Sequence, residues 1–189
     1  MTPQDFLTIL SRAAILKTTT RHCYTQENRK ESVADHSWRI ALMAMLLSGE
    51  PEFQDTDMNK VIRMCLIHDL GETFTGDIPS FEKTDQNVQT EDAQFLTWAN
   101  TFPSPQRQEW LSLLDEMEKL QTKEARTYKA LDKLEALISH NESDLSTWLP
   151  LEYDLQLTYG QENVQFSPYL TALRKHIDQW TLAKITPKP

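Results

Sequence analysis

The stretch IHDLGETFTGDIP, residues 67–79, decides how this chain is interpreted. It holds the adjacent pair His68–Asp69, followed by Glu72 and then by Asp77 shortly before a proline. The apolar segment VIRMCLI leads into it with the spacing of a helix. Because a core helix does not normally end in so dense a group of metal-binding and proton-transferring side chains, we interpret this stretch as the active-site element.

Length and composition favour one helical domain. The chain has 189 residues, of which 39% are hydrophobic, and this is enough to build a single core. Only four glycines, together with abundant Leu, Met, Glu, Lys and Gln, favour helix over sheet. The sequence therefore predicts an all-α fold, a single helical bundle of about seven or eight helices over residues 1–189.

Charge and hydropathy argue against several classes of function. The net charge of −9 argues against a nucleic-acid-binding surface, which is normally basic. No apolar run reaches the roughly 18 residues that span a bilayer, and the first residues lack the apolar core of a signal peptide. Cys23 and Cys65 are too few for a disulfide framework. We therefore expect a cytoplasmic protein with reduced thiols that binds neither nucleic acid nor membranes.

Helical spacing and chain-breaking residues divide the sequence into segments. We expect helices from Thr2–Pro3 to near Leu16, from Ser32, from Asp57 to Gly71, over about residues 86–99, from Ser104–Pro105, over 123–140, over 148–159 and from Ser167–Pro168. Asn141 to Asp144 should form a polar break. Residues 17–31, which include Arg21 and His22, show no helical stripe and are expected to form a long, functional loop.

Two further polar residues occupy inward or flanking positions of separate expected helices. His36 lies on the apolar stripe of the helix that starts at Ser32, and Asp132 lies beside the stripe of segment 123–140. Each has an ordinary explanation when taken alone: a buried histidine bonded to a carbonyl, or a surface aspartate paired with a lysine.

Together with the His68–Asp69 pair, these residues form a set of two imidazoles and two carboxylates. Such a set suits Mn, Co, Ni, Fe or Zn, and facing helices of a bundle are where such sites are built.

The order His, His-Asp, Asp carries a family resemblance. The segments ESVADHSWR (31–39), HDLGETFTGDIP (68–79) and ALDKLEA (130–136) match, in order, the three motifs of the HD-domain metal-dependent phosphohydrolases. The chain is most similar to the 5′-deoxynucleotidase branch, which removes phosphate from deoxyribonucleoside 5′-monophosphates. TGDIP and the position of Arg21 support this branch. The likeness covers roughly residues 6–140, and the C-terminal helices at about residues 147–184 are less diagnostic.

The resemblance implies a metal site and a mechanism. It makes four residues the ligands of one divalent transition metal ion, Mn, Co, Fe, Ni or Zn: His36, His68, Asp69 and Asp132. A water bound to that metal would attack the phosphorus atom of a nucleoside 5′-monophosphate. A binuclear site would need more histidines between the second and third motifs, and residues 70–131 contain none.

The resemblance also implies roles around the metal. Glu72 corresponds to the catalytic acidic residue of the family, and Asp77 to an aspartate of the catalytic and substrate site, where it could accept a hydrogen bond from a sugar hydroxyl. Arg21 corresponds to the arginine near the phosphate. The next position holds tryptophan in the branch and His22 here, so the preference for sugar and base stays open.

Two alternatives also stay open. A related HD phosphohydrolase could cleave a cyclic dinucleotide, guanosine tetraphosphate or a nucleoside triphosphate. Such substrates call for more basic residues than Arg21, Arg29, Lys30 and Lys83, the ones near the motifs, so we favour a monophosphate. The second alternative is an HD protein that binds metal and nucleotide without turnover. A homodimer is expected from the resemblance and from the aromatic residues of the last helices.

Overall fold

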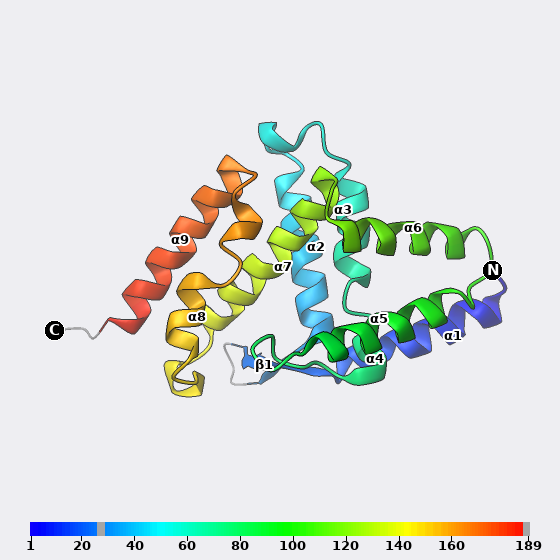
Figure 1. Cartoon of the computed structure of the whole chain (residues 1–189), viewed down its shortest axis with the longest axis horizontal. Helices are drawn as coiled ribbons and strands as arrows, with labels where there is room; N and C mark the ends of the chain where they lie inside the picture. The colour runs from blue at the N-terminus through cyan, green and yellow to red at the C-terminus, as the bar shows by residue number, and fades with distance from the viewer. Residues whose placement is uncertain (26–28, 187–189) are drawn as a thin grey trace.

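Three helices that pack together near the middle of the molecule build its core. They are α2 (Val33–Leu47), α3 (Met58–Ile67) and α7 (Lys123–Glu142) (Figure 1). The computed structural model describes residues 1–25 and 29–186. Fully buried side chains fill the space between the three helices, among them Ile40, Met64 and Leu131. The all-α prediction is confirmed, and the three predicted sequence motifs lie on or next to these central helices.

The other helices surround this centre. On one side of α7 lie α8 (Glu152–Thr158) and α9 (Pro168–Ile185), and on the other side lie α1 (Pro3–Ala13), α5 (Asp85–Ala99) and α6 (Gln106–Lys119) (Figure 1). The short helix α4 (Glu72–Thr75) follows α3 closely. Short 3₁₀ turns complete the chain at Ala14–Lys17, Pro51–Phe53, Leu145–Thr147 and Glu162–Val164. In the part of the chain that the structure describes, no helix has the length and apolarity needed to cross a bilayer.

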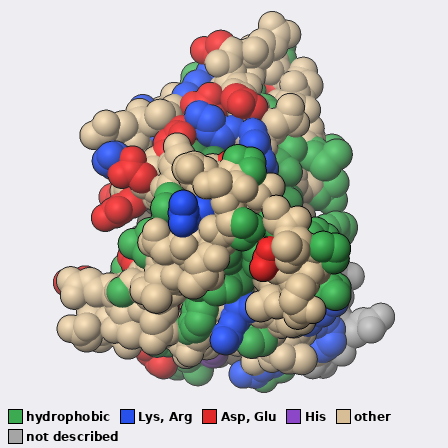
Figure 2. All heavy atoms as spheres, turned by 90° about the vertical axis from the view of Figure 1, so that its right-hand side faces the viewer, with side chains coloured by type: hydrophobic (Ala, Val, Ile, Leu, Met, Phe, Trp, Pro, Cys, Tyr) green, Lys and Arg blue, Asp and Glu red, His purple; other side chains and the backbone are tan. Residues whose placement is uncertain are grey.

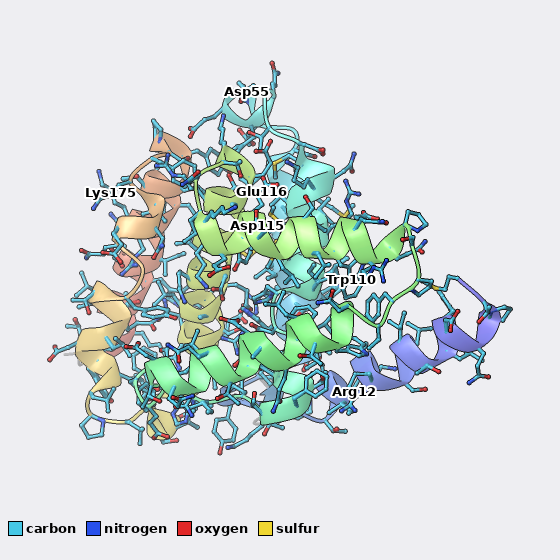
Figure 3. The ribbon with its side chains drawn as sticks, turned by 45° about the vertical axis from the view of Figure 1, so that its right-hand side comes forward. Arg12, Asp55, Trp110, Asp115, Glu116 and Lys175 are labelled. Carbon is cyan, nitrogen blue, oxygen red and sulfur yellow. The ribbon has the colours of Figure 1, made fainter. Side chains whose placement is uncertain are left out.

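An aromatic cluster joins α5 to α6. Figure 3 shows Trp110 reaching from α6 toward the segment below it. Its ring lies 4.9 Å from the ring of Phe102, which in turn lies 4.9 Å from that of Trp98. These edge-to-face contacts fix α5 against α6. They matter for the site because α5 also covers the turn between α3 and α4.

Helix α2 starts after Ser32, as the sequence predicted, and a capping box fixes this start. The Ser32 side chain accepts a hydrogen bond from the Asp35 amide, and the Asp35 carboxylate accepts one from the Ser32 amide. Reciprocal bonds of this kind satisfy two of the free amides at a helix start. The cap therefore fixes where α2 begins. His36 lies on the buried face of this helix and is 1% exposed.

The prediction of a loop over residues 17–31 is wrong. The described part of this segment contains two short antiparallel strands, β1 (Thr20–Tyr24) and β2 (Lys30–Ser32), paired as Thr20 with Ser32 and Tyr24 with Lys30. Strands are normally predicted from alternating apolar residues. Here the inward residues of β2 are Glu31 and Ser32, so polar side chains that find partners inside the fold hide the alternation.

The polar break expected at Asn141 begins later, because α7 continues to Glu142. Asn141 is buried, and its amide nitrogen donates a hydrogen bond of 2.9 Å to the Thr181 hydroxyl on α9. A tertiary partner therefore satisfies a polar group that, in sequence, indicated a helix end.

Candidate metal centre and active site

The four predicted metal ligands converge, although they come from three separate segments. The Nε2 atom of His36 on α2 lies 3.8 Å from Asp69 Oδ2 and 3.4 Å from Asp132 Oδ1 on α7. His68 follows α3 directly, and its Nε2 atom lies 3.0 Å from Asp69 Oδ2 and 3.9 Å from Asp132 Oδ1. Two imidazole nitrogens and two carboxylate oxygens thus face one another across a space that one ion could fill.

The hydrogen bonds of both histidines direct their Nε2 atoms into this space. His68 Nδ1 donates to the Cys65 carbonyl at 2.9 Å. His36 Nδ1 is hydrogen-bonded to the carboxylate of Glu135 on α7. A histidine whose Nδ1 is held by an oxygen carries its free lone pair on Nε2, which is the usual arrangement for a metal ligand.

The arrangement fits a divalent metal. The Nε2 atom of His68 is buried and has no hydrogen-bond partner in the structure. An unsatisfied buried nitrogen is costly, and a coordinated cation would satisfy it. The mixed nitrogen and oxygen set of the predicted ligands suits a transition metal.

Both aspartates of the set remain ionised. Burial would raise the pKa of Asp69, but the imidazoles of His68 and His36 hold it below its ordinary value. Burial would likewise raise the pKa of Asp132, but Lys129 and Lys133 hold it well below its ordinary value. Both groups are therefore available as anionic ligands.

The two oxygens of Asp132 face different partners. Its Oδ2 lies 3.0 Å from Lys129 Nζ and 3.4 Å from Lys133 Nζ, whereas its Oδ1 faces the imidazoles. The lysines therefore orient the carboxylate with one oxygen toward the candidate metal position. The sequence left two roles open for Asp132, a salt bridge with a lysine or an inward-pointing ligand. The structure shows both: Oδ2 pairs with the lysines and Oδ1 points inward.

Arg21 on β1 lies between two buried acids. Its Nε is 3.4 Å from Glu31 Oε2, and its Nη1 is 3.7 Å from Glu135 Oε2. The Ser139 hydroxyl lies 2.7 Å from Glu31 and 2.6 Å from Glu135, and so bridges the two acids. Arg21 lines the cavity beside the candidate metal position, and its buried Nη1 atom has no aligned hydrogen-bond partner. A guanidinium held this way can offer donors to an anion in the cavity.

Among the described residues, ligand atoms of His36, His68 and Asp69 lie close enough to hold an ion, and so do those of a second group, Glu31, His36 and Glu135. The Arg21 guanidinium beside Glu31 and Glu135 already supplies a positive charge, and Glu135 is engaged by His36 Nδ1. We therefore interpret this group as support for His36 and Arg21.

Glu72 and Asp77 line the same cavity. Glu72, at the first position of α4, is 4% exposed. Burial and the neighbouring carboxylates of Asp69 and Asp77 raise the pKa of Glu72 to about 10. Burial also raises the pKa of Asp77. Gly76 turns the chain with a φ of 76°, a left-handed conformation that glycine adopts without strain, and so places Asp77 against the cavity.

A family model described as an HD domain matches residues 13–174 of this chain. The chain belongs to the HD domain family. Its predicted likeness to HD phosphohydrolases is thereby confirmed, and HD membership implies a divalent metal.

Individual HD relatives extend this result. A 5′-deoxynucleotidase from Dictyostelium discoideum is 35% identical over 115 residues, and the match covers 57% of this chain and 60% of that protein. A 5′-deoxynucleotidase from Schizosaccharomyces pombe is 31% identical over 163 residues, covering 76% of this chain and 78% of that protein. The crystal structure of a predicted metal-dependent phosphohydrolase from Magnetospirillum magnetotacticum has a TM-score of 0.80 at 28% identity, covering 96% of this chain and 93% of that one.

Several residues of the HD site were not predicted from the sequence as site residues. Glu135, Ser139 and Glu31 support the histidine and the arginine, and Glu152, Gln156 and Tyr159 belong to the cavity wall. Glu135 could have been found from its position three residues after Asp132 on the same helical face. Glu152 carries no such signal, because its partners lie on other elements.

Proposed function

We propose that this HD protein is a divalent-metal-dependent phosphohydrolase that releases phosphate from nucleoside 5′-monophosphates, as a 5′-deoxynucleotidase. The observation that carries the proposal is the meeting of His36, His68, Asp69 and Asp132 beside Arg21, whose Nη1 has no aligned hydrogen-bond partner. The names of the Dictyostelium and Schizosaccharomyces relatives support the substrate class. This chain spans 60% of the length of the Dictyostelium protein, so the activity of that whole protein enters here as part of the proposal.

The proposed ion is Mn, Co or Fe in preference to Zn. Four protein ligands would close a tetrahedral zinc site, whereas hydrolysis needs a further coordination position. When bound, such an ion supplies a hydroxide near neutral pH and polarises a phosphoryl oxygen.

The residues of the chain supply the remaining steps. Arg21 orients the phosphate by donating to its oxygens, because it lines the cavity and its Nη1 donor makes no aligned hydrogen bond within the protein. Glu72 holds a proton on its carboxyl in the metal-free site and is placed to exchange it with water or the leaving 5′-oxygen. Asp77 accepts a hydrogen bond from a sugar hydroxyl.

A panel of nucleotides tests the proposal. Purified protein treated with a chelator and reloaded with Mn²⁺ or Co²⁺ should release inorganic phosphate from deoxyribonucleoside 5′-monophosphates. Asp132→Ala should abolish both metal binding and phosphate release. Turnover that persists in the chelated Asp132→Ala protein would contradict the metal assignment, and nucleotide binding without any phosphate release would favour the non-catalytic alternative.

One observation supports the alternative in which the substrate is a more highly charged nucleotide. Lys129 and Lys133 line the cavity, so the basic residues near the site are not limited to those expected from the motifs. Both lysines are, however, paired with Asp132. A monophosphate therefore stays the favoured substrate, and faster hydrolysis of deoxynucleoside triphosphates in the same panel would reverse that order.

We also propose a homodimer formed through the outer face of α2. Trp38, Leu42, Met45 and Leu46 recur at the spacing of one helical face and are 63%, 38%, 58% and 70% exposed. Further apolar side chains appear on the face that carries α1 and α6, where charged groups interrupt them (Figure 2). Of the aromatic residues in the last helices, Trp148 is buried against His140, whereas Trp180 is 42% exposed.

The proposal includes one domain and a cytoplasmic location. A single apolar core that runs from Leu16 to Ile177 supports one domain. Cys23 and Cys65, both free and buried, suit a reducing compartment.

A further inference from the structure

A buried carboxylate with two imidazoles beside it forms part of the wall of the active-site cavity. Glu152 opens α8 and is 5% exposed. Its Oε1 lies 3.1 Å from His22 Nε2 on β1, and its Oε2 lies 3.4 Å from His140 Nε2 on α7. We call these three residues the Glu152 cluster. β1, α8 and the end of α7 lie side by side in Figure 1, and all three members of the cluster line the cavity.

The Glu152 cluster adjoins the phosphate end of the site. Arg21 and His22 are consecutive residues of β1, and side chains of consecutive strand residues normally point to opposite faces. The pairing of β1 with β2 is irregular between Thr20 and Tyr24, and both side chains line the same cavity. A substrate bound through its phosphate to Arg21 would extend into the cavity that His22 also lines.

The polar atoms of the Glu152 cluster are not satisfied by one another. The Nε2 atoms of His22 and of His140 are both buried, and neither has an aligned hydrogen-bond partner in the structure. Burial would raise the pKa of Glu152, but His140 and the Leu149 amide hold it below its ordinary value, so the carboxylate is charged. Unsatisfied buried polar groups beside a charged acceptor call for a ligand or water to complete them.

A purely structural role explains only one oxygen of Glu152. Its Oε2 accepts the Leu149 amide at 2.6 Å, a bond that holds the start of α8. Its Oε1 faces His22, whose ring stands edge-on to Phe81 at a centroid distance of 5.6 Å. His22, which is partly buried, and its buried carboxylate partner thus form a polar part of the cavity wall.

We propose that the Glu152 cluster is the specificity-determining subsite for the nucleoside half of the substrate, where Glu152, positioned by His22, accepts a hydrogen bond from a donor group of the nucleoside. The inference rests on the proposed function, because that function fixes the phosphate at the metal and Arg21. The shared chemistry of the ligand is an O–H or N–H donor, on the sugar or on the base. A carboxylate accepts hydrogen bonds from such donors. A site built to bind a hydroxyl or N–H group rejects substrates that lack this group.

The test compares nucleotides with a phosphate ester that has no nucleoside. Kinetics are measured for wild type, Glu152→Gln and His22→Phe with Mn²⁺ on nucleoside 5′-monophosphates and on p-nitrophenyl phosphate. Glu152→Gln keeps a carbonyl oxygen for the Leu149 amide, and His22→Phe keeps the ring against Phe81. The matched control is Asp154→Asn, which removes an exposed charge from the same helix.

In each of the two cluster variants, the ratio of kcat/KM for the nucleotide to kcat/KM for p-nitrophenyl phosphate should fall about tenfold or more, mainly through KM. The control should keep the wild-type ratio. A fall of both activities together in both variants would show a structural role and overturn the inference, as would an unchanged ratio. If wild type cleaves p-nitrophenyl phosphate but no nucleotide, the proposed function fails and the inference fails with it. If wild type cleaves nucleotides but the variants keep its ratio, only the inference fails.

The same panel identifies the donor. If the effect of Glu152→Gln is equal for all bases and disappears for a 2′,3′-dideoxynucleotide, the donor is a sugar hydroxyl. If it is confined to bases with N–H groups on their pairing edge, such as guanine, the donor belongs to the base.

Discussion

His36 and Glu135 are 99 residues apart in sequence, yet the Nδ1 atom of the histidine is hydrogen-bonded to the glutamate carboxylate inside the protein. The bond fixes the ring so that Nε2 faces Asp69 and Asp132. Glu135 is fully buried and also contacts Ser139 and Arg21. The orientation of the first metal ligand and the position of the phosphate-binding arginine therefore depend on one carboxylate.

Glu135→Gln should weaken metal binding by about 10–100-fold, because the ring of His36 loses its charged partner and part of its basicity. Titration of the chelated protein with Mn²⁺ or Co²⁺ by calorimetry measures this directly. Glu118→Gln removes an exposed carboxylate on α6 and is the matched control. Equal metal affinity in the two variants would contradict a role for Glu135 in orienting His36.

Arg21→Lys should lower kcat/KM for nucleoside monophosphates by about 10–100-fold while metal affinity stays near that of wild type. Lysine keeps a positive charge near Glu31 and Glu135 but cannot offer the two parallel donors of a guanidinium. Alanine is a poorer choice, because it would leave two buried acids without their cation. Steady-state kinetics together with a metal titration separate the two effects, and unchanged kinetics would exclude a phosphate contact for Arg21.

Glu72→Gln should stabilise the metal-free protein at neutral pH while removing activity. The pKa of Glu72 is about 10 in the folded protein, against 4.5 for an ordinary glutamate. Between these values the folded state binds a proton that the unfolded state has lost, so the stability of wild type falls as pH rises through this window. Denaturant unfolding with chelator at pH 7 should show a gain on the order of 1–3 kcal/mol in the variant.

The pH dependence provides the control for Glu72→Gln. Below the ordinary pKa of a glutamate, the side chain is protonated in both states of wild type, and the stability difference should disappear. A difference that is the same at acidic and neutral pH would indicate a change in packing and contradict the buried proton.

Gly71→Ala should destabilise the protein by about 1–3 kcal/mol, because a Cβ at this position would lie 2.7 Å from Glu91 Cγ and 3.3 Å from the Glu91 carbonyl oxygen on α5. Thermal unfolding measures the effect. The control is Gly49→Ala, where the nearest atom to a new Cβ, the Leu46 carbonyl oxygen, is 3.9 Å away. Equal stability of the two variants would show that α5 does not approach the turn after His68 as closely as the structure indicates.

Leu46→Glu should convert a dimer into a monomer if the outer face of α2 is the interface, because a charge in an apolar contact must be desolvated without a partner. Sedimentation velocity on wild type and variant checks this. Leu182→Glu changes an exposed leucine on α9, 48% exposed, and should keep the dimer. A monomeric wild type would contradict the proposed dimer.

The sequence by itself determined the helices and the chemical identity of the site. Helical periodicity placed α2, α3 and α7, and the apolar stripe of α2 predicted that His36 points inward. His68 and Asp69 are adjacent in sequence, so their proximity does not depend on the tertiary structure. Local patterns of this kind are readable because hydrogen bonds and side-chain spacing within one helix depend only on nearby residues.

Only the tertiary structure decided which polar residues lie inside. Glu31, Glu135 and Glu152 are ordinary surface residues by composition, yet each is 5% exposed or less. Burying a carboxylate is unfavourable unless donors or cations meet it, and the partners here come from distant segments of the chain. Pattern alone therefore assigns such residues to the surface. Folding brings together the partners that keep these glutamates inside. The same contacts form the strand pair and the wall of the cavity.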